Sequence, residues 1–496
     1  MGLLTKINED IAHAMRARDA AKLGTLRLIK SALVNREVER GRALDEAEER
    51  QVMQQMVKQR RDAIDQFRSG GREDLAAKDE AEIALLFPRV AMSAAQLLAD
   101  VQLTGSPQRA ATELRSAALH RQLASPRQLF ETMVEFWGDH FNIAATGSPE
   151  GFYKVVDDRD VIRAHVFGDF GQMLHASARS LAMLYYLDNV SNRATGPNEN
   201  YARELMELHT LGVDGGYTEQ DVAEVARCFT GWTATGVGQG APVFAFVASR
   251  HDDGPKTVLG NLLPAGGGIG DGNAVLDLLA AHPATARFLA TKLCQRFIGD
   301  APQSTAVDSV AAAFTASGGD LPTVMRALFG SAEFISSYDR KIRRPVDYLL
   351  ACVRATGATV SNGYQNSLQA RLTALGQMPF RWPTPDGYPD AFEDWVNAGA
   401  MLERWNFAFA LVENRLPGLA VDVAALLAGA NTPALIVARL ADRLWHRALS
   451  DADAQALVSF AASGGNVDRV LSAGEILARA REVAGLLLSS PCFNYR

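Results

Sequence analysis

The stretch NENYARELMELHTLGVDGGYTEQDVAEVARCFTGW, residues 198–232, decides the fold of this chain. Asn198 after a proline predicts a helix start, because its side chain can accept hydrogen bonds from free first-turn amides, and Gly212 predicts the helix end. A glycine-rich turn follows. Thr218, with Asp221 three residues later, has the spacing of a capping box. The stretch therefore predicts two helices joined by a tight turn.

The first of these helices has a polar face beside an apolar one. At about 100° per residue, four polar side chains fall on one arc: Asn200, Arg203, Glu204 and Glu207. Carboxylates at i and i+3 can converge on one cation, and a histidine brought close by the fold would add an imidazole ligand. The candidate residues for a polar ligand or a divalent metal are therefore Asn200, Glu204, Glu207, His140 and His209.

The same face also fits a structural interpretation. Arg203 can pair one turn away with Glu207 or with Glu199, as in a buried salt-bridge network. Neither Glu204 nor Glu207 is followed three residues later by a histidine, which metal-binding helices commonly carry. His140 belongs to the apolar stripe of another predicted helix, where a histidine is more often a core residue than a ligand. The sequence leaves both interpretations open.

Composition places the chain among soluble globular proteins. It has 496 residues, 48% of them hydrophobic and 22% charged, which predicts two or more domains. The net charge of -7 gives no overall attraction to nucleic acid or to an anionic membrane. Four scattered cysteines without a CxxC spacing favour a reducing compartment. With no signal-peptide pattern and no long apolar window, we expect a cytoplasmic protein without a membrane span.

From about residue 91 the chain is a series of amphipathic helical patterns, so the predicted fold class is mainly α. Residues 243–247 and 257–259 flank a turn signal and predict one β-hairpin. His251 and Asp252 in that turn could orient a catalytic base, although a plain turn is favoured. The glycine-rich PAGGGIGDGN that follows is interpreted as a flexible loop, with a phosphate cradle as the alternative.

Residues 376–390, GQMPFRWPTPDGYPD, must be irregular, because proline removes backbone donors and fixes φ. Such a segment usually caps a core. A lid that contacts a ligand is the alternative.

Residues 1–86 predict a small block of three helices with equal numbers of acidic and basic residues. Its segments LLTKINEDIAHAMRARD, LGTLRLIKSALVNREVERGR and VKQRRDAIDQFRSGGREDLAAKDEAEI resemble the N-terminal helical part of the GatB/YqeY-like family. That resemblance implies association with tRNA or a tRNA amidotransferase, for which Lys58, Arg60 and Arg61 are the candidate contacts. A solvated helix face is the alternative for this cluster.

A second resemblance covers about residues 100–496, after a junction at 87–99. FWGDHFNI, KTVLG, HPATARFLATKLCQRF, LGQMPFRWPTPDGY and LSSPCFNYR, with the opening stretch, follow the order of the bacterial domain-of-unknown-function 1800 family. That family is large, mostly helical and often exported. Its usual N-terminal section is absent in this interpretation, which is compatible with a natural fusion, an artefact or an engineered chimera.

The sequence thus supports several function classes. The leading hypothesis is an uncharacterised bacterial helical protein whose polar face around Glu204 binds an ion or polar ligand. The alternatives are a tRNA- or amidotransferase-associated module, a metal-assisted hydrolase, and a non-catalytic scaffold with a protein partner.

Overall fold

The computed structural model describes residues 83–236, 242–446 and 449–496. The chain divides into two compact units, and the described residues belong almost entirely to the second, which comprises Ile83–Ala124 and Gln128–Arg496. This unit is mainly α-helical with three two-stranded sheets in its described part, so the predicted fold class is confirmed. Lys58, Arg60 and Arg61 lie outside the described residues, as does the predicted N-terminal block apart from residues 83–86.

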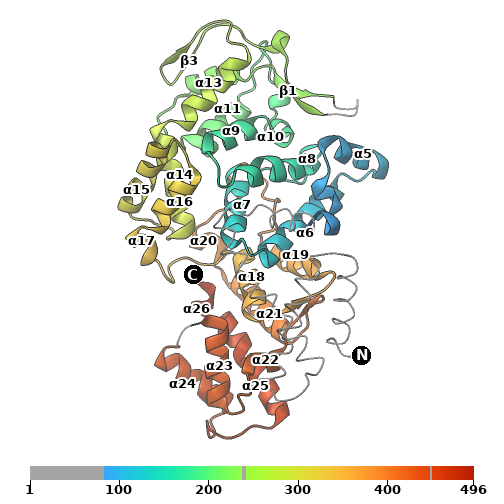
Figure 1. Cartoon of the computed structure of the whole chain (residues 1–496), viewed down its shortest axis with the longest axis vertical. Helices are drawn as coiled ribbons and strands as arrows, with labels where there is room; N and C mark the ends of the chain where they lie inside the picture. The colour runs from blue at the N-terminus through green and yellow to red at the C-terminus, as the bar shows by residue number, and fades with distance from the viewer. Residues whose placement is uncertain (1–82, 237–241, 447–448) are drawn as a thin grey trace, which may run out of the picture. The chain divides into compact units, whose positions relative to one another are not determined.

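A first hydrophobic core is formed by helices between residues 83 and 329, around fully buried side chains such as Trp137. In Figure 1, α14, α15 and α16 pack side by side. The helices of this part are α5 (Ala94–Thr104), α6 (Gln108–Ala124), α7 (Gln128–His140), α8 (Glu150–Asp157), α9 (Phe170–Ala178), α10 (Leu181–Tyr186), α11 (Asn200–Glu204), α12 (Glu219–Cys228), α13 (Ile269–Ala280), α14 (Pro283–Phe297), α15 (Ser304–Ser317), α16 (Leu321–Phe329) and the short α17 (Ala332–Ile335).

A second core is formed by the C-terminal helices. Helix α6 contributes to both cores, with Leu114 in the first and Leu119 in the second, because residues five apart point to different sides of a helix. The C-terminal helices are α18 (Pro345–Ala355), α19 (Tyr364–Ala374), α20 (Phe392–Trp395), α21 (Ala398–Val412), α22 (Val423–Leu427), α23 (Pro433–Trp445), α24 (Asp451–Ala461), α25 (Ala473–Ser489) and α26 (Pro491–Asn494).

The opening stretch folds as two helices joined by a turn. Gly212, at φ 81°, stands at the end of the first helix, and Thr218 and Asp221 form the predicted capping box of α12. One feature differs from a regular helix: after α11 the chain continues as a π-helix over Leu205–Thr210. Single π-helical turns are often found at functional sites, and this one carries His209.

The predicted hairpin is wrong in its pairing. β2 (Val243–Phe246) pairs with β1 (Trp232–Thr235), and β3 (Lys256–Val258) pairs with β4 (Asn261–Leu263), all antiparallel. β2 and β3 thus each pair with a strand that is closer along the sequence than the predicted partner. The third sheet joins β5 (Thr359–Val360) to β6 (Leu419–Ala420).

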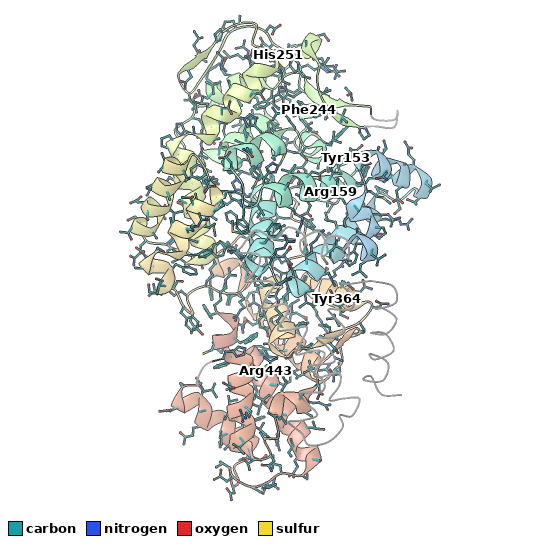
Figure 2. All side chains as sticks on the ribbon, in the orientation of Figure 1. Tyr153, Arg159, Phe244, His251, Tyr364 and Arg443 are labelled. Carbon is teal, nitrogen blue, oxygen red and sulfur yellow. The ribbon has the colours of Figure 1, made fainter. Side chains whose placement is uncertain are left out.

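Buried polar contacts explain why residues 247–255 are not a simple turn. His251, labelled in Figure 2, is buried against the Phe246 ring, and its Nε2 lies 3.2 Å from Asp271 of α13. Lys256 Nζ donates to the same carboxylate at 2.6 Å. Asp252 instead accepts from Arg227 at 2.8 Å, so His251 and Asp252 do not form the pair that the base hypothesis requires. The segment is therefore held against α13.

Asp271 also bears on the glycine-rich loop. A Cβ added at Gly267 would lie 1.9 Å from Asp271 Oδ1, so this carboxylate folds back over the loop at the start of α13. The place where a phosphate would meet the helix amides thus holds a side chain of the protein itself.

Within the described ranges, no helix is both long and apolar enough to cross a bilayer.

Candidate functional site

Helix α7 carries a stripe of acidic side chains opposite its apolar face. Glu131, Glu135 and Asp139 follow one another at intervals of four residues, which places them on one side of the helix, one above the other. The apolar residues between them, including Met133 and Trp137, are fully buried in the first core. The helix therefore turns its carboxylates away from the core and toward the segment at residues 376–390.

That proline- and aromatic-rich segment is irregular, as predicted, and it is fastened to the end of α7. The carbonyl of Phe380 accepts from the Ala145 amide at 2.8 Å, and Asn142 Nδ2 donates to the Thr384 carbonyl at 2.6 Å. A Cβ on Gly387 would lie 2.1 Å from the Asp139 carbonyl oxygen, so only a glycine fits this approach. The segment caps the core here and also forms one wall of a pocket.

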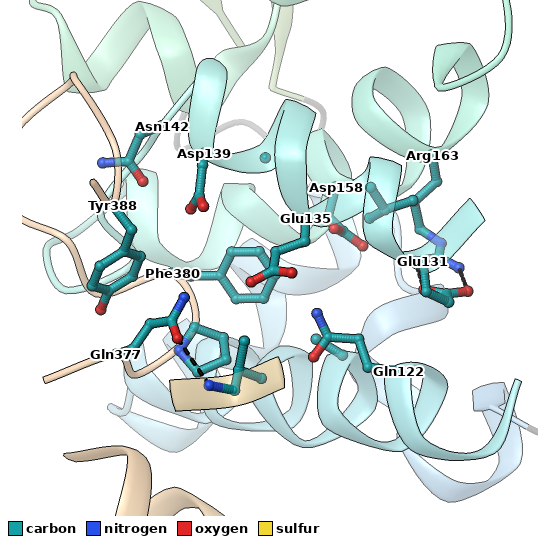
Figure 3. A pocket seen from close by; sticks show the side chains of 15 residues that line it. Gln122, Glu131, Glu135, Asp139, Asn142, Asp158, Arg163, Gln377, Phe380 and Tyr388 are labelled. Atoms are coloured by element: carbon teal, nitrogen blue, oxygen red, sulfur yellow. Dashed lines mark hydrogen bonds and ion pairs between the residues drawn. The ribbon is translucent and has the colours of Figure 1, made fainter. Parts of the chain in front are cut away.

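The pocket between these two elements, the α7 pocket, is a solvent-open hollow, and the space between its atoms amounts to about 580 Å³ with open solvent counted in. Figure 3 shows the carboxylates of Glu135 and Asp139 facing the rings of Phe380 and Tyr388 across it. Its lining residues are Ala118, Gln122, Glu131, Val134, Glu135, Gly138, Asp139, Asn142, Asp158, Arg163, Val346, Gln377, Pro379, Phe380 and Tyr388. An adjoining hollow shares Glu135 and adds Asp347 and Arg354.

Arginines balance the carboxylates of this region. Glu131 is paired with Arg163 at 2.7 Å, and Asp139 with Arg344 at 2.9 Å. Glu135 lies between two guanidinium groups, 2.5 Å from Arg344 and 3.0 Å from Arg296. Because each acidic side chain has a basic partner, the walls carry little net charge.

Burial nevertheless changes how these carboxyl groups titrate. It raises the pKa of Glu135 to about 7, against the opposing effect of Arg344 and Arg296. Burial also raises the pKa of Asp139. At Asp347 burial is outweighed by Arg296, Arg496 and Arg344, so the pKa lies below its ordinary value. Glu135 and Asp347, both beside Arg296, are thus pushed toward opposite protonation states at neutral pH.

Amide groups complete the polar lining. Gln122 Oε1 is buried and has no hydrogen-bond partner, which leaves an acceptor that a ligand hydroxyl would satisfy. Gln377 uses its Oε1 to accept from the Val346 amide at 2.9 Å, so its NH₂ group stays available as a donor. The pocket therefore offers separate donors and acceptors next to two aromatic rings.

The predicted polar face on α11 and the following π-helix lies elsewhere. Arg203 pairs with Glu199 at 3.3 Å, as the i,i+4 interpretation predicts, and more closely with Glu219 of α12 at 2.7 Å. This network is about one third exposed at Arg203, so it is not a buried one. Asn200 is exposed. The pKa of Glu204 is raised, mainly by its partial burial and also by the negative charge of Glu207.

The two predicted histidines do meet. His140 Nε2 lies 3.1 Å from the His209 carbonyl oxygen, and both rings are buried among aromatic side chains such as Phe141. Burial lowers the pKa of His209 to about 3, and the pKa of His140 also lies well below its ordinary value. Within the described part of the chain, no three histidine, cysteine or carboxylate side chains are grouped closely enough to bind a metal ion.

Sequence reasoning missed Glu135 and Asp139 as a site. The signal was present: the acidic residues at i, i+4 and i+8 of α7 lie on the face opposite the apolar stripe that contains His140. What the sequence lacked was their partner, because residues 376–390 lie about 240 positions further along the chain.

Comparisons with known proteins give a family and a set of partial relatives. A family model described as "Protein of unknown function (DUF1800)" matches residues 12–495 and so begins well before residue 100. Among curated proteins, the chain is similar to "Altered inheritance of mitochondria protein 41, mitochondrial" of Eremothecium gossypii, with 33% identity over 84 residues, 17% of this chain and 46% of that protein. The namesake of Lachancea thermotolerans is 30% identical over 84 residues, 17% and 45% of the two chains.

The protein of the same name from Saccharomyces cerevisiae is 32% identical over 78 residues, 16% of this chain and 42% of that protein. The chain thus matches less than half the length of each of these relatives. No solved structure matches. The resemblance of residues 1–86 to the GatB/YqeY-like family stays a prediction.

Proposed function

Because the chain belongs to the DUF1800 family, whose description names no activity, we propose a function from its own geometry: the α7 pocket binds a small uncharged ligand rich in hydroxyl groups, and Glu135 exchanges a proton with it. The observation that carries the proposal is the Glu135 carboxyl, with a pKa of about 7, in the wall of a pocket that also presents amide groups and two aromatic rings. The bound ligand would lie between α7 and residues 376–390.

The charge balance of the pocket selects against ionic ligands. Glu131, Glu135 and Asp139 each have an arginine within 3.0 Å, so neither a cation nor an anion finds an uncompensated opposite charge. A neutral ligand avoids the desolvation cost of a charge and still meets many polar groups.

The lining matches a polyhydroxylated molecule in its details. Hydroxyl groups both donate and accept, as Gln122 Oε1, the Gln377 amide and the carboxyl groups require. The rings of Phe380 and Tyr388 offer apolar faces to the carbon skeleton of a sugar-like ligand. At neutral pH about half of Glu135 is protonated, and Asp347 in the adjoining hollow is ionised, so these two carboxyl groups would supply the acid and the base for hydrolysis of such a ligand.

The other hypotheses rest on different residues. Ligand or metal binding at Asn200, Glu204 and Glu207, and tRNA association through Lys58, Arg60 and Arg61, remain proposals. A scaffold role likewise remains open to a pull-down experiment. The α7 pocket is preferred because it is a hollow in the protein surface into which several donors and acceptors point.

The test is a binding titration of the full chain by calorimetry, with glucose, N-acetylglucosamine and cellobiose as neutral probes and agmatine as a cationic one. We expect at least one sugar to bind, with weaker affinity as the pH rises above about 7 and Glu135 loses its proton. Glu135→Gln keeps a donor at this position and should remove that pH dependence. Gln122→Leu should weaken binding about tenfold, or about 1.4 kcal/mol.

Glu403→Gln is the matched control, because Glu403 forms an ion pair with Arg371 and neither residue lines the pocket. It should leave sugar binding unchanged. Binding of agmatine without any of the sugars would show that the pocket recognises a cation. Sugar binding that is unaffected by Gln122→Leu would place the ligand outside the α7 pocket.

A further inference from the structure

The described part of the chain contains four lysines, and one of them differs from the rest. Lys154, Lys256 and Lys341 are each at most 2% exposed and lie within 2.6 Å of an aspartate carboxylate. Lys292 on α14 is partly exposed and has no carboxylate within ion-pair distance among the described residues. Its amine lies 3.2 Å from His140 Nδ1 and 5.5 Å from the centre of the Phe288 ring.

The hydrogen bonds of His140 fix which nitrogen carries its proton. The His209 carbonyl can only accept, so His140 Nε2 must donate to it at 3.1 Å. His140 Nδ1 is then bare and accepts a hydrogen bond from the Lys292 amine. Because His140 is buried among aromatic rings, this acceptor holds the amine in a defined position.

From this geometry we propose that Lys292 is a nucleophilic amine that forms an imine with a small, uncharged aldehyde or ketone. The amine nitrogen adds to the carbonyl carbon, and the carbonyl oxygen takes the proton that the nitrogen loses. The resulting carbinolamine loses that oxygen as water, with the second amine proton, and a C=N bond remains. No oxidant or reductant is needed. His140 acts as the positioning residue.

The surroundings of Lys292 favour the neutral amine. Burial lowers its pKa to about 8, although three carboxylates oppose this shift: Asp139 of α7 and Asp386 and Asp390 of the proline- and aromatic-rich segment. The imidazoles that face the amine, His140 and His209, are themselves neutral near pH 7, since burial lowers both of their pKa values. Asp139 is paired with Arg344, but the Asp386 carboxylate accepts from the neutral side chains of Trp382 and Thr384, so its charge repels an anionic carbonyl compound, which is why the substrate class is uncharged.

This site is separate from the α7 pocket. Asp139 lines that pocket, whereas the next residue, His140, points to Lys292, because consecutive residues of a helix differ by about 100° in direction. The inference therefore does not rest on the proposed sugar-like ligand, and either can fail alone.

The test is reductive labelling of the full chain with glycolaldehyde and cyanoborohydride, followed by peptide mass spectrometry of every lysine. Free Nα-acetyl-lysine in the same tube is the reference. At pH 7 a lysine of pKa about 8 holds roughly two hundred times more neutral amine than free lysine, so we expect labelling of Lys292 at least about tenfold faster than the reference. The ion-paired Lys154, Lys256 and Lys341 should be labelled more slowly than the reference.

Variants and a second probe sharpen the result. Asp386→Asn should move the pH midpoint of Lys292 labelling downward, since Asp386 raises the pKa of Lys292, and the control Asp308→Asn should not. Glyoxylate, which is anionic, should lose most of the rate advantage. The proposal is overturned if Lys292 reacts no faster than the reference, or if its labelling midpoint is that of ordinary lysine.

Discussion

The close approach of Gly387 to α7 gives a sharp test of how the α7 pocket is built. Gly387 has a φ of 75°, and a Cβ placed there would lie 2.1 Å from the Asp139 carbonyl oxygen and 2.8 Å from its carbon. These contacts are with backbone, which cannot rotate away as a side chain can. Gly387→Ala must therefore separate the proline- and aromatic-rich segment from the end of α7.

Gly376 in the same segment provides a matched control. Its φ is 80°, and nothing lies within 4 Å of the Cβ that alanine would add. Gly376→Ala thus carries only the cost of a left-handed backbone, about 1–2 kcal/mol. Gly387→Ala carries the same cost plus overpacking, which adds about 1–3 kcal/mol. The difference between the two variants isolates the close approach.

The measurement is urea-induced unfolding of both variants and the parent chain, followed by tryptophan fluorescence. We expect Gly387→Ala to lower the free energy of unfolding by about 2–5 kcal/mol and to exceed Gly376→Ala by at least about 1 kcal/mol. Equal losses in the two variants would show that residues 376–390 do not rest on the Asp139 backbone. In that case the wall of the α7 pocket described above would be wrong.

Three further changes test other parts of the unit. Arg404→Met should lower the free energy of unfolding by about 2–4 kcal/mol, because Asn494 Oδ1 and the Arg343 carbonyl lose a buried charged donor. As a control in the same urea assay, Arg415→Met at an exposed position should lower it by under about 1 kcal/mol. The folded-state pKa of His209, about 3, lies below the unfolded value of about 6.5, so the unfolded chain binds more protons between these pH values. The free energy of unfolding therefore decreases as the pH is lowered from about 6.5, by up to about 1.4 kcal/mol per pH unit. His209→Gln should reduce that slope in urea titrations between pH 6.5 and 5, and an unchanged slope would contradict the buried neutral ring. Asp139→Asn should lower the pKa of both Glu135 and Lys292, observed as downward shifts in the pH dependence of sugar binding and of lysine labelling.

Local signals in the sequence were sufficient for the elements they concern. The Thr218 and Asp221 capping box and the stop at Gly212 depend only on residues within a few positions, so the two helices of the opening stretch follow from them. The π-helix over Leu205–Thr210 did not follow, because its extra residue per turn has no distinct periodicity in so short a run. The strand pairing failed for a different reason: β2 pairs back with β1 and β3 pairs onward with β4, while His251 and Lys256 between and beside them contact Asp271 of α13, which no local pattern indicates.

The candidate site required contacts that no local pattern contains. Arg203 has three acidic residues within reach on its own helix or the next, and the structure chooses mainly Glu219 of α12 over the two neighbours that helix spacing suggests. The α7 pocket depends on residues 376–390 meeting Asn142, and proline-rich segments carry no period from which a partner can be inferred. Distant pairing of this kind is decided by how the whole unit packs.

Asp139 links the two proposed sites through charge. Its carboxylate raises the pKa of Glu135 on the pocket side of α7 and the pKa of Lys292 on the other side. The Asp139 carboxylate is itself paired with Arg344 at 2.9 Å. Protonation of Asp139 would lower the pKa of both Glu135 and Lys292, and loss of the Arg344 partner would raise both. A ligand that displaces Arg344 from Asp139 would strengthen the negative field at Lys292 and raise the pKa of its amine, which leaves less of the neutral amine. Occupancy of the α7 pocket by such a ligand should therefore slow carbonyl labelling of Lys292, whereas a ligand that leaves this ion pair intact should not.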